Sequence, residues 1–363
     1  MLAYKGGSLQ IDLHYHACYV IARIAGFNQE DSRIIATCSQ FVDDSFIDEH
    51  EIYPGGFSFQ KIVTAHHCKL GEGLFENLDR REQRMVWVPF HFFPGGEGDC
   101  YGEKLTCRAD NKYIKKIKQK ILKQQNLKFK LELIGIVSHV LLDSFSHEGF
   151  SGISSKLNEV KNNKIDILNK SENGGELAKT KLKHFKKKYK YELPDYTIIS
   201  SIAGEFFSNA LGHGAVATLP DLPYLKWKYS YENCEGRKKV IKRDNPKIFL
   251  KGLKSLYNFF VKITKNQRVK FEKIEDDISN ILEVPGRKVE RIKLWGNYIR
   301  EIDFLEEENI PVYYGDIWLK IGFEKYDYES WYSEPFYKFH QAADYYKTFV
   351  LRELLPEEKI FVI

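Results

Sequence analysis

Three polar residues stand at a regular spacing inside the apolar stretch GIVSHVLLDSFSH, residues 135–147. His139, Asp143 and His147 follow one another at intervals of four, so in a helix they share one face, with a drift of about 40° per step. The residues between them are mostly apolar, which predicts a helix over about 131–147 that is buried on most sides. Because buried ionisable groups need a partner, and a cation suits two imidazoles and a carboxylate, we expect these side chains to bind metal.

The same spacing indicates how many ions the helix serves. His139 and His147 are separated by about 12 Å of helix rise, which is too far for easy ligation of one ion. Asp143 lies midway, and its two oxygens can bridge two ions, with each histidine serving one. Two metal ions about 3.5–4 Å apart are the arrangement that hydrolyses phosphoesters and amides. The alternative, core histidines hydrogen-bonded to carbonyls, suits any single histidine better than three residues in register.

A helical hairpin is predicted near the start of the chain. Residues 13–25 show helical spacing of apolar side chains up to Gly26, which is typical of the residue that ends a helix. Asn28 is a typical N-cap, with Asp31 three residues later, for a second helix through about residue 44. An antiparallel pair of this kind places the beginning of the first helix beside the end of the second.

The outer ends of this hairpin carry two further pairs of candidate ligands. His14 and His16 lie at one end and Asp43 and Asp44 at the other, so the hairpin delivers all four to one place. At a helix start the two histidines diverge, and we favour His14 as the ligand, with His16 as a hydrogen-bond partner. One of the two aspartates is expected to ligate, and the sequence leaves that choice open.

Three other histidines are weaker candidates for the same metal site. His67 follows His66 in a predicted helix. His91 lies in the apolar segment Pro-Phe-His-Phe-Phe-Pro, where an imidazole needs a partner. His213 stands between two glycines, which permit close approach of the backbone to a metal or substrate. We take Asp143 and His213 as the candidate catalytic residues.

The elements that must position these side chains are predicted to be mostly α-helical, in one domain over residues 1–363. The apolar run over 84–93 is β-prone, but Pro89 restricts any strand there to a short or edge strand. The segment at about 153–195 is rich in Lys and Asn and is predicted to be an exposed insertion. Residues 335–355 form a last amphipathic helix, on which His340 and Asp344 are expected to be a surface ion pair.

Composition sets the class of protein. The chain has 363 residues, of which 43% are hydrophobic and 29% charged, as in soluble globular proteins and unlike disordered ones. The net charge of +5, from 55 basic and 50 acidic residues, does not by itself indicate nucleic-acid binding. No stretch approaches the roughly 20 apolar residues of a transmembrane helix. The first residues lack the apolar core of a signal peptide, which favours a cytoplasmic location.

The six cysteines fit that compartment, since they form no CxxC pair. Cys18 and Cys38 lie in apolar helical patterns, where free cysteine is a small core residue. Cys100 and Cys107 flank a short segment that contains glycine, and they could pair if the protein were exported.

The segment GIVSHVLLDSFSH resembles the metal-binding helix of the zinc-dependent phospholipase C and single-strand nuclease superfamily. The resemblance implies an α-helical bundle with long irregular loops, phosphodiesterase activity and up to three zinc ions. It assigns His139 and Asp143 to the central pair of the helix and His147 to the following histidine. Asp43 or Asp44 would be the aspartate at a helix end, and His14 or His16 the early histidine. A wider set of motifs over residues 10–230 resembles an uncharacterised bacterial family; the motifs are HYHACYVIARIAGF, SQFVDD, VPFHFFPGG, HVLLDSFSHEGFSG and GHGAVATLPDLPY.

The sequence therefore predicts a metal-dependent hydrolase of phosphoesters, with a di-metal His/Asp site that activates water. Zinc suits these ligands best, and iron or manganese also fits. Lysines in 112–130 and 156–190 could attract a polyanion such as nucleic acid or a lipid headgroup, although a solvated face is the simpler interpretation. Two alternatives remain: a helical interaction protein with a structural metal, and an HD-type phosphohydrolase, whose adjacent His-Asp pair is missing here.

Overall fold

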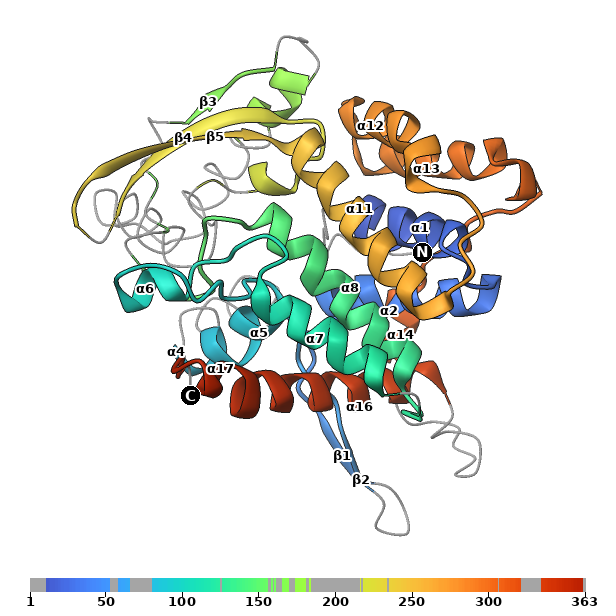
Figure 1. The fold of residues 1–363 in the computed structure, drawn as a ribbon, viewed down its shortest axis with the longest axis horizontal. Coiled ribbons are helices and arrows are strands. Elements are labelled where there is room, and N and C mark those ends of the chain that lie inside the picture. Colours follow the sequence, from blue (N-terminus) through green and yellow to red (C-terminus); the bar gives the residue numbers. More distant parts are fainter. Residues whose placement is uncertain are drawn as a thin grey trace.

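The computed structural model shows a mostly helical protein with two small antiparallel sheets (Figure 1). It describes residues 11–52, 58–65, 80–124, 126–155, 158, 160, 165–169, 174–180, 183, 216, 218–233, 235–305, 307–320 and 334–361. In these ranges no helix combines the length and the apolar character needed to cross a membrane.

The first part of the chain supplies the helical hairpin and the central helix. Its elements are η1 (Asp12–Ala17), α1 (Cys18–Ile24), α2 (Gln29–Asp44), β1 (His50–Ile52), β2 (Ser58–Gln60), α4 (Arg80–Glu82), η2 (Gln83–Trp87), α5 (Val88–Phe90), α6 (Tyr101–Lys104), α7 (Lys112–Lys123) and α8 (Lys130–Ser146). Here η1 and η2 are π-helical turns.

The second part adds a three-stranded sheet and the helices that surround the centre. Its elements are β3 (Asp166–Ile167), η6 (Leu219–Asp221), β4 (Lys226–Glu232), β5 (Lys238–Asp244), α11 (Asn245–Thr264), η7 (Phe271–Lys273), α12 (Glu275–Glu283), α13 (Lys288–Glu301), η8 (Asp303–Leu305), α14 (Gly315–Lys320), α16 (Pro335–Thr348), η9 (Phe349–Leu354) and α17 (Leu355–Glu357).

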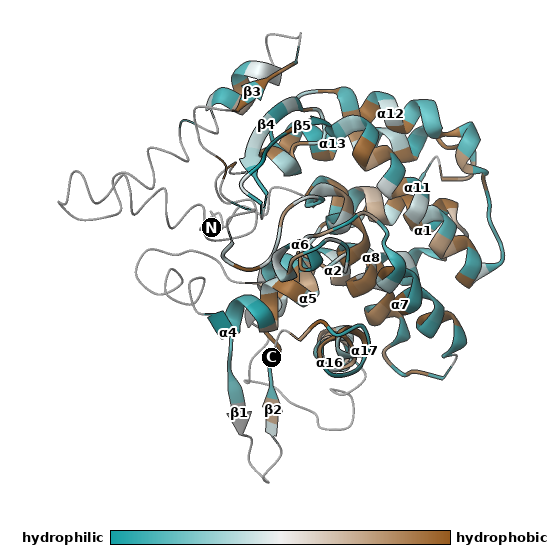
Figure 2. Ribbon diagram, turned by 60° about the vertical axis from the view of Figure 1, so that its left-hand side comes forward, coloured by the Kyte–Doolittle hydropathy of each residue, from teal (hydrophilic) through white to brown (hydrophobic). Residues whose placement is uncertain are grey.

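Helix α8 is the centre of the main hydrophobic core, with α2, α7, α11 and α16 packed against it (Figure 1). The predicted α2 is confirmed to its cap, because the Asn28 side chain accepts a hydrogen bond from the Asp31 amide at 2.8 Å. Gly135 lets α2 and α8 approach closely: a Cβ there would lie 2.6 Å from the Ile35 carbonyl oxygen. Figure 2 colours much of α8 as hydrophobic, and its apolar residues are buried in the main core.

A smaller core lies beside the three-stranded sheet, whose strand order is β3-β4-β5. It takes in described parts of the predicted insertion, since Asn158, Val160 and Ala178 are buried and β3 pairs with β4. Most of 153–195 lies outside the described residues, so the exposed insertion as a whole stays a prediction, as does the single domain.

The β-prone run 84–93 does not begin as a strand, because residues 80–90 form consecutive helical turns. Pro89 lies just after the π-helical turn η2, and its lack of an N–H interrupts the helical hydrogen bonds there. Val86, Val88 and Phe90 are all buried, so tertiary packing overrides the β propensity of the run.

Cys100 and Cys107, which could have paired in an exported protein, are not bonded to each other. Cys107 is a buried free thiol whose Sγ lies 3.7 Å from the Ser144 carbonyl oxygen. Cys100 is disulfide-bonded, so its partner is a different cysteine. Cys18 and Cys38 are free and buried, as predicted.

Candidate metal centre

The centre begins with His139 and Asp143, one turn apart on α8 and both buried. His139 Nε2 lies 3.0 Å from Asp143 Oδ2. The other nitrogen of the ring, Nδ1, lies 2.8 Å from the carbonyl oxygen of Ser39 on α2. Since the close approach of α2 and α8 at Gly135 brings that carbonyl within reach, helix packing fixes the direction of the His139 ring.

His91 reaches the same point from the end of α5. Its Nδ1 lies 3.1 Å from Asp143 Oδ2 and 3.2 Å from His139 Nε2. Its Nε2 lies 2.8 Å from the carbonyl oxygen of Thr64. The His91 imidazole therefore has two polar neighbours in this apolar segment: a carbonyl on one side and the His/Asp cluster on the other.

His14 supplies the third imidazole, from the π-helical turn η1. Its ring stacks on that of His139 with centroids 4.0 Å apart, and its Nε2 lies 3.1 Å from Asp143 Oδ1. Both atoms are buried, yet among the described residues neither makes a hydrogen bond of good geometry. Single π turns inside helices are frequent at functional sites, and here the turn places His14 rather than His16 at the cluster.

Of the two aspartates at the end of α2, Asp43 faces the cluster. Its Oδ1 lies 3.8 Å from His91 Nδ1 and 3.9 Å from His139 Nε2. The Asp44 carboxylate instead accepts a hydrogen bond of 2.7 Å from the Tyr313 hydroxyl. The Asp43 side chain is 22% exposed, whereas Asp143 is 1% exposed, so the cluster meets solvent on the Asp43 side.

The tautomers of His139 and His91 leave two bare nitrogens at the centre. A carbonyl oxygen only accepts, so the nitrogens that face Ser39 and Thr64 carry the hydrogens, and in the neutral rings the inward nitrogens have lone pairs. These lone pairs and the Asp143 carboxylate converge at 3.0–3.2 Å and repel one another unless a cation or a proton lies between them. Ligands of a tetrahedral zinc ion, each about 2.0–2.1 Å from the metal, lie about 3.3 Å apart. The donor set fits a divalent metal.

Two groups of donor atoms close enough to hold an ion share His139. One is His14, His139 and Asp143, and the other is Asp43, His91 and His139. Because His139 has only Nε2 available, it can serve one ion, and this Nε2 lies 3.2 Å from Nδ1 of His91. The first group then retains His14 and the second oxygen of Asp143.

Asp143 belongs to the first group, and its Oδ2 also lies 3.1 Å from His91 Nδ1 of the second, but the histidines around it are distributed differently from the expectation. We expected His139 and His147 on opposite oxygens. The structure places both near Oδ2, with His147 Nδ1 at 3.5 Å, and places His14 near Oδ1. His147 departs from the expected position because it is the C-cap of α8. It therefore no longer lies on the helical face that carries His139 and Asp143.

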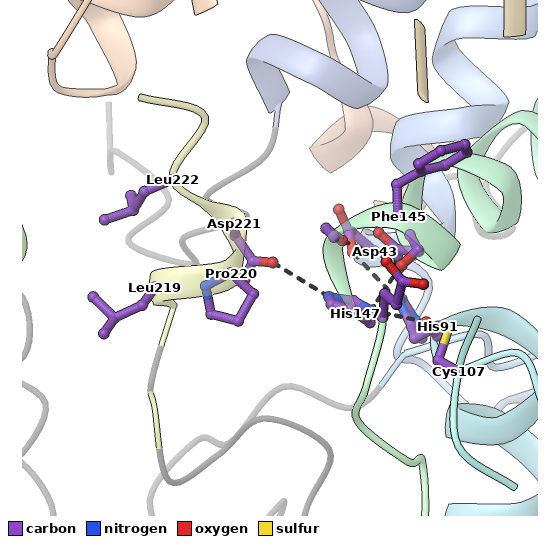
Figure 3. Close-up of polar contacts among 12 residues, drawn as sticks. Asp43, His91, Cys107, Phe145, His147, Leu219, Pro220, Asp221 and Leu222 are labelled. Carbon is purple, nitrogen blue, oxygen red and sulfur yellow. Dashed lines mark hydrogen bonds and ion pairs between the residues drawn. The ribbon is translucent and has the colours of Figure 1, made fainter. Parts of the chain in front are cut away.

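His147 forms its own arrangement next to the cluster (Figure 3). Its Nδ1 donates to the His91 carbonyl oxygen at 2.8 Å, and its ring stacks on Phe92 with centroids 4.5 Å apart. Its Nε2 lies 3.2 Å from Oδ1 of Asp221, which projects from the short helix η6. Asp221 therefore joins the centre from a segment far away in the sequence.

Burial and neighbouring charges shift the pKa values of these groups in different directions. Burial, joined by the Asp143 and Asp44 charges, raises the pKa of Asp43 to about 6, although the imidazoles of His139 and His91 oppose the shift. Burial also lowers the pKa of His139, and His14 adds to that effect. Burial opposes charge on Asp143, but the imidazoles of His147 and His139 hold its pKa well below the usual range.

His147 differs from the other imidazoles because it lies between two carboxylates. Burial disfavours its charged form, but Asp143 and Asp221 outweigh burial and raise its pKa to about 9. The two carboxylates thus favour positive charge on the His147 imidazole beside the cluster, and a bound cation would take over the same electrostatic role.

The candidates fall into three sets. The structure brings together His14, Asp43, His91, His139, Asp143 and His147. His16 and Asp44 lie outside both donor groups, and His16 is a buried imidazole whose pKa burial lowers to about 4. His67 and His213 lie outside the described residues.

Sequence reasoning did not assign three other contributors. Of these, only Asp221, in the turn-forming segment Leu-Pro-Asp-Leu-Pro, has a side chain of a type that marks it as a possible metal ligand. The carbonyls of Ser39 and Thr64 gave none, since every residue has a carbonyl.

The chain belongs to DUF6765, a family of unknown function whose model matches residues 9–354. Neither the curated proteins nor the solved structures that we searched contain a match.

Proposed function

We propose that this protein is a divalent-metal-dependent hydrolase of phosphoesters and that its fold is of the phospholipase C and single-strand nuclease type. The observation that carries the proposal is the convergence of bare imidazole nitrogens and carboxylate oxygens around Asp143, within 3.0–3.2 Å of one another. Zinc is the ion that this donor set suits best, with iron or manganese as alternatives.

The residues of the chain divide into two tasks. Asp43, His91 and His139 would hold one ion together with Asp143. His14 and the other Asp143 oxygen would hold a second ion, whose coordination further groups would complete. When bound, such ions supply water activation and neutralise charge on phosphoryl oxygens. His147, paired with Asp221, is the cationic group beside the cluster and can donate a proton from Nε2 to a leaving oxygen.

Solvent access to the cluster supports a catalytic metal over a purely structural one. A structural site is closed by four protein ligands, whereas a catalytic site keeps a position open. The side chain of Asp43 is 22% exposed, and within the described part of the chain His14 and Asp143 Oδ1 are the two ligands on their side. A non-catalytic helical protein with a structural metal is the alternative that the experiment below would identify.

The test begins with metal content. Elemental analysis of purified wild type should give two metal equivalents, or one tightly held and one restored by added Zn²⁺. His139→Ala should lose metal, whereas His16→Gln should retain it while showing the same circular dichroism. Bis(p-nitrophenyl) phosphate and p-nitrophenyl phosphate then distinguish diester from monoester cleavage. Metal retention in His139→Ala would refute the centre, and full metal without hydrolysis of any phosphoester would indicate the structural alternative.

The substrate and the location stay proposals. Part of the lysine-rich face of α7 is neutralised by acids of the chain, since Lys112 and Lys116 pair with Glu358. Attraction of a nucleic acid or a lipid headgroup by this face is correspondingly weaker than composition suggests. The cytoplasmic location remains a prediction, and the disulfide of Cys100 counts against it, because disulfides persist in oxidising compartments.

A further inference from the structure

Helices α7 and α11 pack against each other and line a concave site that shares no residue with the metal centre. Its volume is about 310 Å³, at the lower end of the range for small-molecule sites. The residues that line it are Asp110, Lys115, Lys118, Gln119, Leu122, Ser255, Asn258, Phe259 and Lys262. We call it the α7–α11 pocket.

Positive charge dominates the α7–α11 pocket. Three lysines line it, and Asp110 is the one acid among its lining residues. Asp110 is already engaged, because its Oδ1 pairs with Lys118 Nζ at 2.7 Å and its Oδ2 accepts from the Ser255 hydroxyl at 2.7 Å. Within the described ranges, Lys115 and Lys262 make no ion pair, so the pocket carries two uncompensated ammonium groups.

These cations lie close enough to affect one another. Burial lowers the pKa of Lys118, Asp110 opposes the shift, and the charges of Lys262 and Lys115 lower the pKa further. An anion in the pocket would relieve this repulsion. A phosphate monoester carries about −1.5 to −2 charges at pH 7 and so matches two free ammonium groups better than a carboxylate does.

The rest of the lining suits an organic group attached to the phosphate. Phe259 is buried and forms an apolar wall with Leu122. Gln119 and Asn258 add amides that donate and accept hydrogen bonds. Apolar walls with a few convergent polar groups are typical of pockets that bind small organic molecules.

We propose that the α7–α11 pocket binds a small molecule carrying a phosphate monoester, with the phosphate against Lys115 and Lys262 and the organic part against Leu122 and Phe259. This proposal does not depend on the function proposed for the metal centre.

Phenylphosphonate, a non-hydrolysable dianion with one ring, is the probe. Isothermal titration calorimetry of the wild type should show one saturable equivalent, bound about tenfold more tightly than inorganic phosphate, which lacks the ring, or benzoate, which lacks the second charge. Lys115→Glu/Lys262→Glu should weaken binding by at least about tenfold. The control Lys123→Glu/Lys251→Glu makes the same change of charge at exposed positions of the same helices, outside the pocket, and should bind like wild type.

The metal centre could also take up the probe, so Asp143→Ala is titrated in parallel. A binding event that survives in Asp143→Ala and disappears in the pocket variant supports the proposal, whether or not the centre holds metal. Binding that only Asp143→Ala removes, equal weakening in the pocket and control variants, or no saturable binding would overturn it.

Discussion

The imidazole of His139 points Nε2 at Asp143 Oδ2, 3.0 Å away and one turn further along α8. The ring cannot turn away, because its Nδ1 is bonded to the Ser39 carbonyl of α2 at 2.8 Å. Both side chains are buried. A helix–helix contact thus holds a lone pair against a carboxylate away from bulk solvent, an arrangement that is stable only with a cation or a proton between the two groups.

Asp143→Asn keeps the size of this side chain and removes its charge. We expect the variant to lose metal on dialysis that leaves the wild type loaded, because the two carboxylate oxygens lie 3.0–3.1 Å from ring nitrogens of His14, His91 and His139. Hydrolysis of bis(p-nitrophenyl) phosphate should fall by more than about 100-fold, since loss of even an outer partner of a metal ligand costs about 10–100-fold. Elemental analysis and initial rates measure both effects, and wild-type metal content in the variant would contradict the assignment.

The neighbours Asp43 and Asp44 provide a matched pair of substitutions. Asp43→Asn removes a charge that faces His91 and His139, so we expect the metal affinity to fall by at least about tenfold. Asp44→Asn removes a charge bonded to the Tyr313 hydroxyl, and the amide oxygen can still accept that bond, so metal affinity should change little. Competition with a chromophoric chelator measures both affinities. A larger loss in Asp44→Asn would reverse the assignment of the two aspartates.

The helices that carry the centre were predictable because their signals are local. Asn28 and the apolar spacing before Asp44 define α2, and the interval of four between His139 and Asp143 places both side chains on one face of α8. The choice between Asp43 and Asp44 was not predictable, because it depends on where Tyr313, 269 residues away, lies.

Long-range packing also explains the failures. The apolar run around Pro89 forms helical turns because Val86, Val88 and Phe90 are buried against other elements, and local propensity contains no information about such contacts. His340 was expected in a surface ion pair, but it is buried and its Nδ1 accepts a 2.9 Å hydrogen bond from the Ile62 amide. Isolated sequence spacing cannot distinguish an exposed helix face from one that a distant segment covers.

The close contact at Gly135 predicts that a larger residue there destabilises the packing of α2 against α8. Gly135→Ala places a methyl group 2.6 Å from both the Ile35 carbonyl oxygen and Cys38 Cβ, so α2 and α8 must separate. We expect a loss of about 1–3 kcal/mol in unfolding free energy, typical of an overpacked core, together with weaker metal binding. Gly296→Ala on α13 is the control, since a Cβ there meets nothing within 4 Å, and it should gain about 0.5–1 kcal/mol. Urea denaturation would refute the close contact if the two variants were equally stable.

The buried His340 is expected to make the folded protein less stable in acid. Burial, with a contribution from Lys61, lowers its pKa from 6.5 to about 3 in the folded protein. The unfolded chain therefore binds the proton first as the pH falls below 6.5, and stability is lost progressively between 6.5 and 3. From pH 7 to pH 5 the loss from this group is about 2 kcal/mol. His340→Gln keeps an acceptor for the Ile62 amide and should lose stability less steeply over that interval in urea titrations.

The exposed His50 provides the matched control for this pH dependence. His50→Gln should retain the full slope of stability between pH 5 and 7. If His340→Gln and His50→Gln showed the same slope as the wild type, His340 would not be the group responsible.

Substitution of Arg243 tests how strongly the geometry of the metal centre depends on the C-terminal end of α8. Its buried guanidinium donates to the carbonyls of Phe145, Ser146 and Glu148 at 3.1, 2.7 and 2.8 Å, and so fixes the turn in which His147 lies. Arg243→Met leaves these carbonyls without their donor, and we expect a loss of about 2–4 kcal/mol in unfolding free energy. Because Asp143 and His147 are on the segment released, metal affinity should also fall by roughly tenfold.

Arg237→Met, at an exposed position just before β5, makes the same chemical change without such contacts to α8 and should leave both properties unchanged. Thermal unfolding with and without added Zn²⁺ separates the two effects, since a variant that binds metal more weakly gains less stability from the same metal concentration. If Arg243→Met were destabilised but gained as much from Zn²⁺ as the wild type, the arginine would support the fold without positioning the centre.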